Sequence, residues 1–154
     1  MESTSLILTS AVEADGPQIH ALEQRCYRAV DVFRPRQIRY LLRSPRCRVL
    51  LLRDVAGILV GCVIGLFRGF KVPSGRVYKI TVNPDFQGQG IGSRLVREIE
   101  QVFRGLGMKR CCAEVRISNQ ASQFMFSRNG YRFEKRLPRY YDDGEDGLKF
   151  WKTL

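Results

Sequence analysis

Three alternating glycines just past the middle of the chain restrict its fold more than any other feature. The segment Gln87–Gly92 reads QGQGIG; it follows a β-rich run and opens a run with helical periodicity. Glycine lets the backbone approach a ligand closely and adopt positive φ angles. The first turn of a helix carries free N–H groups and a partial positive charge. A strand, a glycine turn and a helix in this order therefore predict a binding site for a diphosphate.

Other interpretations of the glycine segment fit less well. No Gly-Lys-Ser/Thr follows it, so it is not a P-loop. It nearly matches a dinucleotide-binding fingerprint, with Ser93 in the third glycine position, but too few residues follow it for a doubly wound domain. A tight turn that binds nothing is the remaining alternative. Arg94 and Arg97, one turn further on, add positive charge and favour the anion site.

Hydrophobic periodicity predicts a mixed α/β (α+β) domain that spans residues 1–154. Expected strands lie at Leu6–Ala11, Val49–Arg53, Ile58–Phe67, Val77–Val82, Arg110–Val115, Tyr131–Lys135 and Leu148–Trp151. Expected helices begin after Asp15 as the cap, at Arg34-Pro35, at Ile91 and at Asn119. The opening strand meander should be antiparallel, and the later helical crossovers require parallel or splayed strands. Alternation should place Tyr78, Ile80 and Val82 on one face.

Composition narrows the classes of function. The net charge of +11 in 154 residues favours acidic partners, phosphate-bearing cofactors among them, although a basic solvated surface is an equal alternative. Five cysteines without a C-x-x-C pair, and one histidine, argue against both disulfides and a metal site. No apolar run is long enough to span a bilayer, and the first residues carry no export signal. The cytoplasm is the expected location.

Several segments together resemble the GNAT superfamily of N-acetyltransferases, and RimI-type protein N-terminal acetyltransferases in particular. The glycine segment is similar to the family's Q/R-x-x-G-x-G/A motif, and EVRISN at Glu114–Asn119 is similar to the E-V-R-x-S-N of RimI-type enzymes. Further similarity is seen in LEQR at Leu22–Arg25, GYRF at Gly130–Phe133 and YYDDGED at Tyr140–Asp146. The resemblance implies a GNAT fold, with a central mixed sheet whose middle strands are splayed and with helices on both faces.

The resemblance also implies acetyl-CoA as the cofactor and a set of residues around it. The cofactor-binding set is Ile80, Thr81, Val82, Gln87, Gly88, Gln89, Gly90, Ile91, Gly92, Ser93, Asn119 and Phe126. Tyr140 and Tyr141 should line the acceptor groove, with Asp31 and Phe33 on the opposite wall. Asn119 is also a good helix N-cap, and the two roles are compatible.

Acetyl transfer requires a neutral amine and a polarised thioester carbonyl. An α-amine has a pKa near 8 and lysine one near 10.4, a difference of about 3.4 kcal/mol at neutral pH. A modest base therefore suffices for an N-terminus, and Glu114 is the candidate, either as the base through water or as a strand carboxylate paired with a nearby arginine. A splayed strand end around Val82 and Asn83 would offer a backbone N–H to polarise the carbonyl. The resemblance favours Val82, and ordinary ladder bonding of these N–H groups is the alternative.

The chain departs from the RimI-type pattern at Phe126, where those enzymes place a tyrosine taken as the general acid. Phenylalanine has no proton to donate, so Tyr140, Tyr131 or water would have to replace it, or the protein binds acetyl-CoA with weak catalysis. Packing in the core is the alternative role of Phe126.

The expected function is transfer of acetyl from acetyl-CoA to a protein N-terminal α-amine, for example that of a ribosomal protein. A small-molecule amine and aminoacyl-tRNA are the alternative acceptors, and the basic charge keeps nucleic acid as a less favoured partner. We expect no metal, no membrane, and a monomer or weak dimer.

Overall fold

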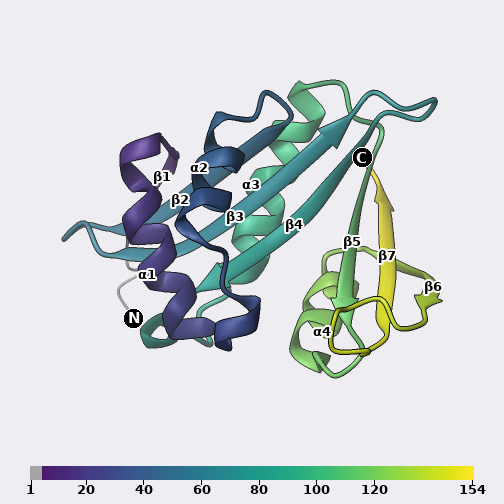
Figure 1. Cartoon of the computed structure of the whole chain (residues 1–154). Coiled ribbons are helices and arrows are strands. Elements are labelled where there is room, and N and C mark those ends of the chain that lie inside the picture. Colours follow the sequence, from purple (N-terminus) through teal and green to yellow (C-terminus); the bar gives the residue numbers. More distant parts are fainter. Residues whose placement is uncertain (1–4) are drawn as a thin grey trace.

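The computed structural model describes residues 5–154 as a seven-stranded mixed sheet with helices on both faces (Figure 1). The strands are β1 (Leu6–Ser10), β2 (Cys47–Asp54), β3 (Leu59–Arg68), β4 (Ser74–Val82), β5 (Arg110–Arg116), β6 (Arg132–Leu137) and β7 (Gly147–Thr153). The helices are α1 (Gly16–Cys26), α2 (Pro35–Arg43), α3 (Ile91–Gly105) and α4 (Gln120–Arg128), with short 3-10 turns at Glu13–Asp15, Ala29–Asp31 and Pro84–Phe86. The predicted fold class is confirmed.

The sheet has the strand order β1-β2-β3-β4-β5-β7-β6, and its middle is splayed. Strands β1 to β4 form the predicted antiparallel meander. β4 and β5 run parallel but pair only over Ser74–Val77 and Arg110–Ala113. Beyond these residues the two strands diverge, which Figure 1 shows as the widening space between β4 and β5. The residues after Val77 and Ala113 therefore border an opening in the sheet.

Two apolar clusters hold the layers together. On one face, α3 presents the fully buried Leu95, Ile99 and Phe103 to the sheet, as its periodicity predicts. On the other face, α1 and α2 pack on β2, β3 and β4 through Ile19 and Ile38. The helix pair covers only this half of the sheet. In the residues that the structure describes, no helix is long and apolar enough to cross a membrane.

A β-bulge at Tyr78 changes which side chains of β4 share a face. Ile64 pairs with Lys79 and Gly65 with Val77, so Tyr78 is an extra residue. Ile80 and Val82 pack with the α3 cluster, whereas Tyr78 stacks on Phe33 on the opposite face, with ring centroids 5.5 Å apart. The prediction that Tyr78, Ile80 and Val82 share a face is therefore wrong for Tyr78, because strict alternation assumes an unbroken register.

Two local expectations also differ from the structure. Asp15 does not cap α1 with its side chain; its carboxylate accepts hydrogen bonds from Val12 N–H (2.7 Å) and from the Arg53 guanidinium (2.9 Å). β4 begins at Ser74, three residues before the expected strand Val77–Val82. Gly75 has strand geometry there because its missing side chain leaves room for the ring of Phe103.

The contact between Gly75 and Phe103 gives a stability prediction. A Cβ atom at Gly75 would lie 2.4 Å from a ring carbon of Phe103, which is completely buried and has no room to move. We expect Gly75→Ala to lower the free energy of unfolding by about 1–3 kcal/mol through overpacking. Urea denaturation measures this change. Gly69→Ala is the matched control, because a Cβ there meets nothing within 4 Å. Equal denaturation midpoints for the two variants would refute the close packing.

Candidate active site

The glycine turn before α3 presents a row of free backbone donors. Gly88 and Gly90 have φ angles of 77° and 72°, which other residues rarely adopt. The first helical hydrogen bond is donated by Arg94 N–H to the carbonyl of Gly90 (3.0 Å). From Gln87 to Ser93, no backbone N–H donates to another group among residues 5–154. The turn therefore has the free donors that an anion site requires, and the binding of a diphosphate there stays a prediction.

Gly92 differs from the other two glycines of the segment. It lies within α3 and has no positive φ angle, whereas the sequence suggested such angles for all three glycines. A Cβ atom there would touch only Val82 and Met125, at 3.9 and 4.0 Å. The protein itself thus tolerates a side chain at this position, and close approach of a ligand is the remaining physical reason for glycine.

The edge of β4 that faces the opening is held by the end of α1. Asn83 N–H donates to Val60 of β3 at 2.8 Å, and because ladder bonds alternate, Ile80 and Val82 face away from β3. The Tyr27 hydroxyl donates to the carbonyl of Ile80 at 2.5 Å, and the Cys26 thiol donates to that of Val82 at 3.2 Å. Burial raises the pKa of Tyr27 to about 12, so it stays a donor.

Asn83 fixes the direction in which the chain leaves β4 toward the glycine turn. Its side chain is buried, its Nδ2 donates to the carbonyl of Leu59 (3.0 Å), and its Oδ1 accepts from Asp85 N–H (3.0 Å) and from Arg25 (3.2 Å). The sequence indicated that the strand ends here and that Val82 or Asn83 offers a free N–H, but the Asn83 N–H is bonded to Val60. The structure shows that this residue joins β3, α1 and the turn before α3.

Glu114 lies on β5 as the first residue beyond the paired region, and its carboxylate is held on one side only. Its Oε2 accepts a hydrogen bond from the Tyr140 hydroxyl (3.0 Å) and pairs with the Arg76 guanidinium. Among residues 5–154, no group donates a hydrogen bond to Oε1. Burial raises the pKa of Tyr140, and Arg76 partly opposes this. The arginine pairing anticipated as an alternative is thus present, yet one carboxylate oxygen stays open.

Arg116, two residues further along β5, joins two loops that belong to the two halves of the sheet. It contacts Asp31 (3.0 Å) in the loop between α1 and α2, and Asp143 and Glu145 (both 2.9 Å) between β6 and β7. Its guanidinium also stacks 4.1 Å from the ring centroid of Tyr141. Hydrogen bonds from the Glu145 N–H and from arginines lower the pKa of Asp143. The loops expected to form the two walls of the groove therefore meet at one residue.

Asp31 is occupied in this arrangement. Its carboxylate pairs with both Arg116 and Arg28 (3.2 Å), so it is balanced by two cations. This geometry favours a role in joining the loops over the amine recognition expected for it. Phe33 does lie at this wall, where its ring stacks on Tyr78 and lies 3.8 Å from the Lys79 ammonium.

Three further predicted residues, described below, lie in α4 or beside it. Asn119 caps this helix, because its Oδ1 accepts from Ser122 N–H at 3.1 Å. Ser93 accepts a hydrogen bond from Asn129 at 3.0 Å, which links α3 to the end of α4. Phe126 is only 4% exposed and packs edge-on against Tyr131, with ring centroids 5.0 Å apart. The packing role of Phe126 is present, and a cofactor contact by it stays a prediction.

Sequence reasoning gave no role to Arg76, Arg116 or Tyr27. Arg116 was within reach, because it is two residues from Glu114 and must share its face of the strand. Arg76 was missed because it lies just before the expected strand Val77–Val82, whereas β4 begins at Ser74. Tyr27 comes from the end of a helix, and no local pattern indicates that it reaches a strand carbonyl.

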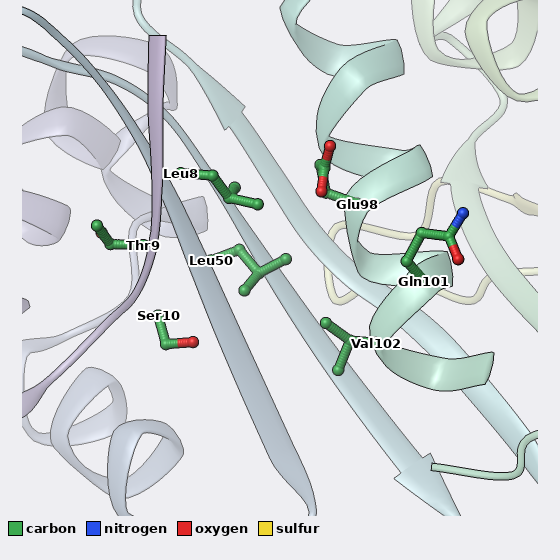
Figure 2. A pocket seen from close by; sticks show the side chains of 7 residues that line it. All are labelled: Leu8, Thr9, Ser10, Leu50, Glu98, Gln101 and Val102. Carbon is green, nitrogen blue, oxygen red and sulfur yellow. The ribbon is translucent and has the colours of Figure 1, made fainter. Parts of the chain in front are cut away.

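A pocket of about 350 Å³ lies away from this site, between the β1 edge of the sheet and α3 (Figure 2). Leu8, Leu50 and Val102 point into it, and Glu98 and Gln101 stand at its rim. Strands β2, β3 and β4 separate β1 from Glu114 on β5, so this pocket takes no part in the site. In the described residues, no group of three acidic, cysteine or histidine side chains is placed to hold a metal ion.

Comparison with known proteins agrees with this geometry. The model of the acetyltransferase (GNAT) family matches residues 16–131. The N-alpha-acetyltransferase RimI of Mycobacterium tuberculosis is 30% identical over 91% of this chain and 87% of its own length. An uncharacterized N-acetyltransferase of Methanocaldococcus jannaschii is 31% identical, but the match spans 62% of this chain and 60% of that protein.

Solved structures show the same fold. A chain of the NatC complex bound to Gag peptide and CoA superposes with a TM-score of 0.86 at 17% identity, covering 97% of this chain and 99% of that one. The ribosomal-protein-S18-alanine N-acetyltransferase of Escherichia coli gives a TM-score of 0.82 at 21% identity, covering 97% and 94%. The family match over most of the sequence and the splayed sheet with its free-donor turn lead to one conclusion: the chain belongs to the acetyltransferase (GNAT) family, whose enzymes use acetyl-CoA.

Proposed function

We propose that this protein acetylates the N-terminal α-amine of a protein or peptide, with acetyl-CoA as the donor. The proposal rests on the carboxylate of Glu114, of which only one oxygen is bound by neighbouring side chains. It lies at the opening between β4 and β5, with Oε2 fixed by Arg76 and Tyr140 and Oε1 free to accept a proton. Such a carboxylate is a base of modest strength, which suits an amine with a pKa near 8 better than a lysine.

The residues of the chain fit the cofactor in two places. The free N–H groups from Gln87 to Ser93 would hold its diphosphate, and the open edge of β4 at Ile80 and Val82 would hold the extended pantetheine arm. Acetyl-CoA supplies the acetyl group as an activated thioester. Thr81 is buried beneath this edge, and Asn119 and Ser93 position α4 beside the turn.

The chain's own groups would carry the proton transfers. Glu114 Oε1 takes a proton from the amine, directly or through water. The Val82 N–H at the open edge would polarise the carbonyl oxygen of the thioester. Tyr140 keeps its proton at neutral pH because its pKa is raised, so it can serve as the donor that Phe126 cannot be. Tyr141 and Phe33 form the two walls between which an N-terminus would enter.

Relatives support the choice of acceptor. The Mycobacterium tuberculosis relative is an N-alpha-acetyltransferase, and a Bacillus subtilis protein, 26% identical over 74% of each chain, is a putative ribosomal protein bS18-alanine N-acetyltransferase. A ribosomal protein N-terminus in the cytoplasm is therefore a suitable acceptor for a monomer or weak dimer of this chain.

A panel of acceptors tests the proposal directly. Release of free coenzyme A is measured with N-terminal peptides, the same peptides blocked at the α-amine but carrying lysine, small amines and aminoacyl-tRNA. We expect turnover on free α-amines and at most a small rate on lysine, because lysine is about 2.5 pKa units harder to deprotonate. Turnover confined to small amines or to aminoacyl-tRNA would refute the proposed acceptor. Acetyl-CoA binding without turnover on any acceptor would indicate a non-catalytic binding protein.

Replacement of the proposed base Glu114 should reduce kcat and leave the affinity for acetyl-CoA unchanged. Glu114→Gln keeps the shape and the contacts to Oε2 but makes the side chain a poor proton acceptor. We expect kcat to fall at least several-fold, toward the 10²-fold typical of general base loss, with the Kd for acetyl-CoA unchanged. Glu98→Gln, which removes the same charge near the distant pocket, is the control. An unchanged kcat for Glu114→Gln would remove this residue from the mechanism.

Loss of the Tyr140 hydroxyl should also lower kcat. In Tyr140→Phe the proton donor and one anchor of Glu114 disappear together, and we expect a drop of about tenfold or more. Because the pKa of Tyr140 lies above its usual value of 10, the wild-type rate should rise with pH through the α-amine pKa near 8 and not fall before pH 10. A full rate in Tyr140→Phe would assign proton donation to water.

A further inference from the structure

The strand register places a row of side chains across the half of the sheet that carries Glu114. Arg76 of β4 lies opposite Cys112 of β5, which lies opposite Trp151 of β7, which lies opposite Arg132 of β6. Directly opposed residues in a sheet point to the same face. These four residues therefore form one continuous row on the face that also carries Glu114.

A second row contains Glu114, Lys149 and Lys135, again directly opposed across β5, β7 and β6. Arg110, two residues before Cys112 on β5, points to the same face. The opposite face of these strands is packed against α3, as the ion pair of Lys152 with Glu100 (3.0 Å) shows. The face with the two rows is therefore the outer one.

This face carries a surplus of positive charge. Two of its cations are balanced, Arg76 by Glu114 and Lys149 by Glu134 (3.5 Å). Arg110, Arg132 and Lys135 are exposed and form no ion pair within residues 5–154. They surround Trp151, which is half-buried in a sheet face that α1 and α2 do not cover (Figure 1). The unpaired cations and the tryptophan are available to a partner.

The arrangement of the site directs an acceptor chain onto this face. At the Arg116 end of β5 the two loops are joined through Asp31 and Asp143, which closes that direction. From Glu114 the uncovered surface extends the other way, toward Cys112 and Arg110. An extended peptide advances about 3.3 Å per residue, and adjacent strands are about 4.8 Å apart. The third to fifth residues of a bound peptide would thus reach the free cations.

We infer that this outer face of β5, β7 and β6 selects acceptors whose residues after the N-terminus, at about positions three to five, are acidic. The inference rests on the proposed function and specifies its substrate class. A peptide is favoured over nucleic acid because the face is continuous with Glu114 and because Glu114 and Glu134 interrupt the cations, which a phosphate backbone would have to pass.

Matched peptides test the inference. Each pair shares the first two residues and carries Asp/Glu or the isosteric Asn/Gln at positions three to five. We expect kcat/KM to be about tenfold higher for the acidic member, mainly through a lower KM, and the advantage to shrink at high salt. Arg132→Glu combined with Lys135→Glu should abolish the advantage and leave kcat/KM for the amide peptide unchanged. Arg39→Glu combined with Arg46→Glu makes the same change in net charge on exposed residues outside this face and should preserve the advantage.

The outcomes separate this inference from the proposed function. Equal kcat/KM for acidic and amide peptides would overturn the inference while leaving N-terminal acetylation intact. No turnover on any peptide would instead overturn the proposed function. If a single-stranded RNA oligonucleotide competes with the peptides, loses this effect in the Arg132 and Lys135 double variant, and the peptide pairs are equal substrates, the face binds nucleic acid and the inference is wrong.

Discussion

Parallel pairing between β4 and β5 lasts for only four residues on each strand, and the functional geometry follows from its end. A strand pair that stays in register satisfies its backbone groups internally. Here the ladder stops after Val77 and Ala113, which leaves the N–H groups of Ile80 and Val82 on β4 open and makes Glu114 the first residue of β5 that does not pair with β4. An extended ligand can pair with that edge as a further strand would, and the Glu114 carboxylate lies beside it.

The opening has to be maintained, because exposed strand edges are costly and tend to find partners. The structure maintains it from both sides. At the β4 edge, Tyr27 and Cys26 donate to the carbonyls of Ile80 and Val82, and Asn83 fixes the turn that follows. On the β5 side, Arg116 ties the loop between β6 and β7 to the loop between α1 and α2. A residue that looks structural, such as Tyr27 or Arg116, thereby sets the shape of the site.

Charge is distributed unevenly around this opening. The glycine turn offers backbone donors to an anion, and Arg116 balances the carboxylates of Asp31, Asp143 and Glu145. On the outer face of β5, β7 and β6, the cations Arg110, Arg132 and Lys135 form no ion pair within residues 5–154. The overall surplus of +11, which by itself suits any acidic partner, is thus partly concentrated next to the proposed acceptor groove.

The sequence by itself determined the features that depend on local chemistry. Periodicity located the strands and the buried stripe of α3, and the alternating glycines located the free-donor turn, because both are fixed by neighbouring residues in the chain. Spacing could not reveal the bulge at Tyr78, which depends on how β4 pairs with β3, so the predicted face of Tyr78 was wrong. Only the tertiary structure could place Arg76 and Tyr140 on the same oxygen of Glu114, since these side chains come from β4, from the loop after β6 and from β5. Such contacts join residues that are far apart in the chain, and no local pattern encodes the geometry at which they meet.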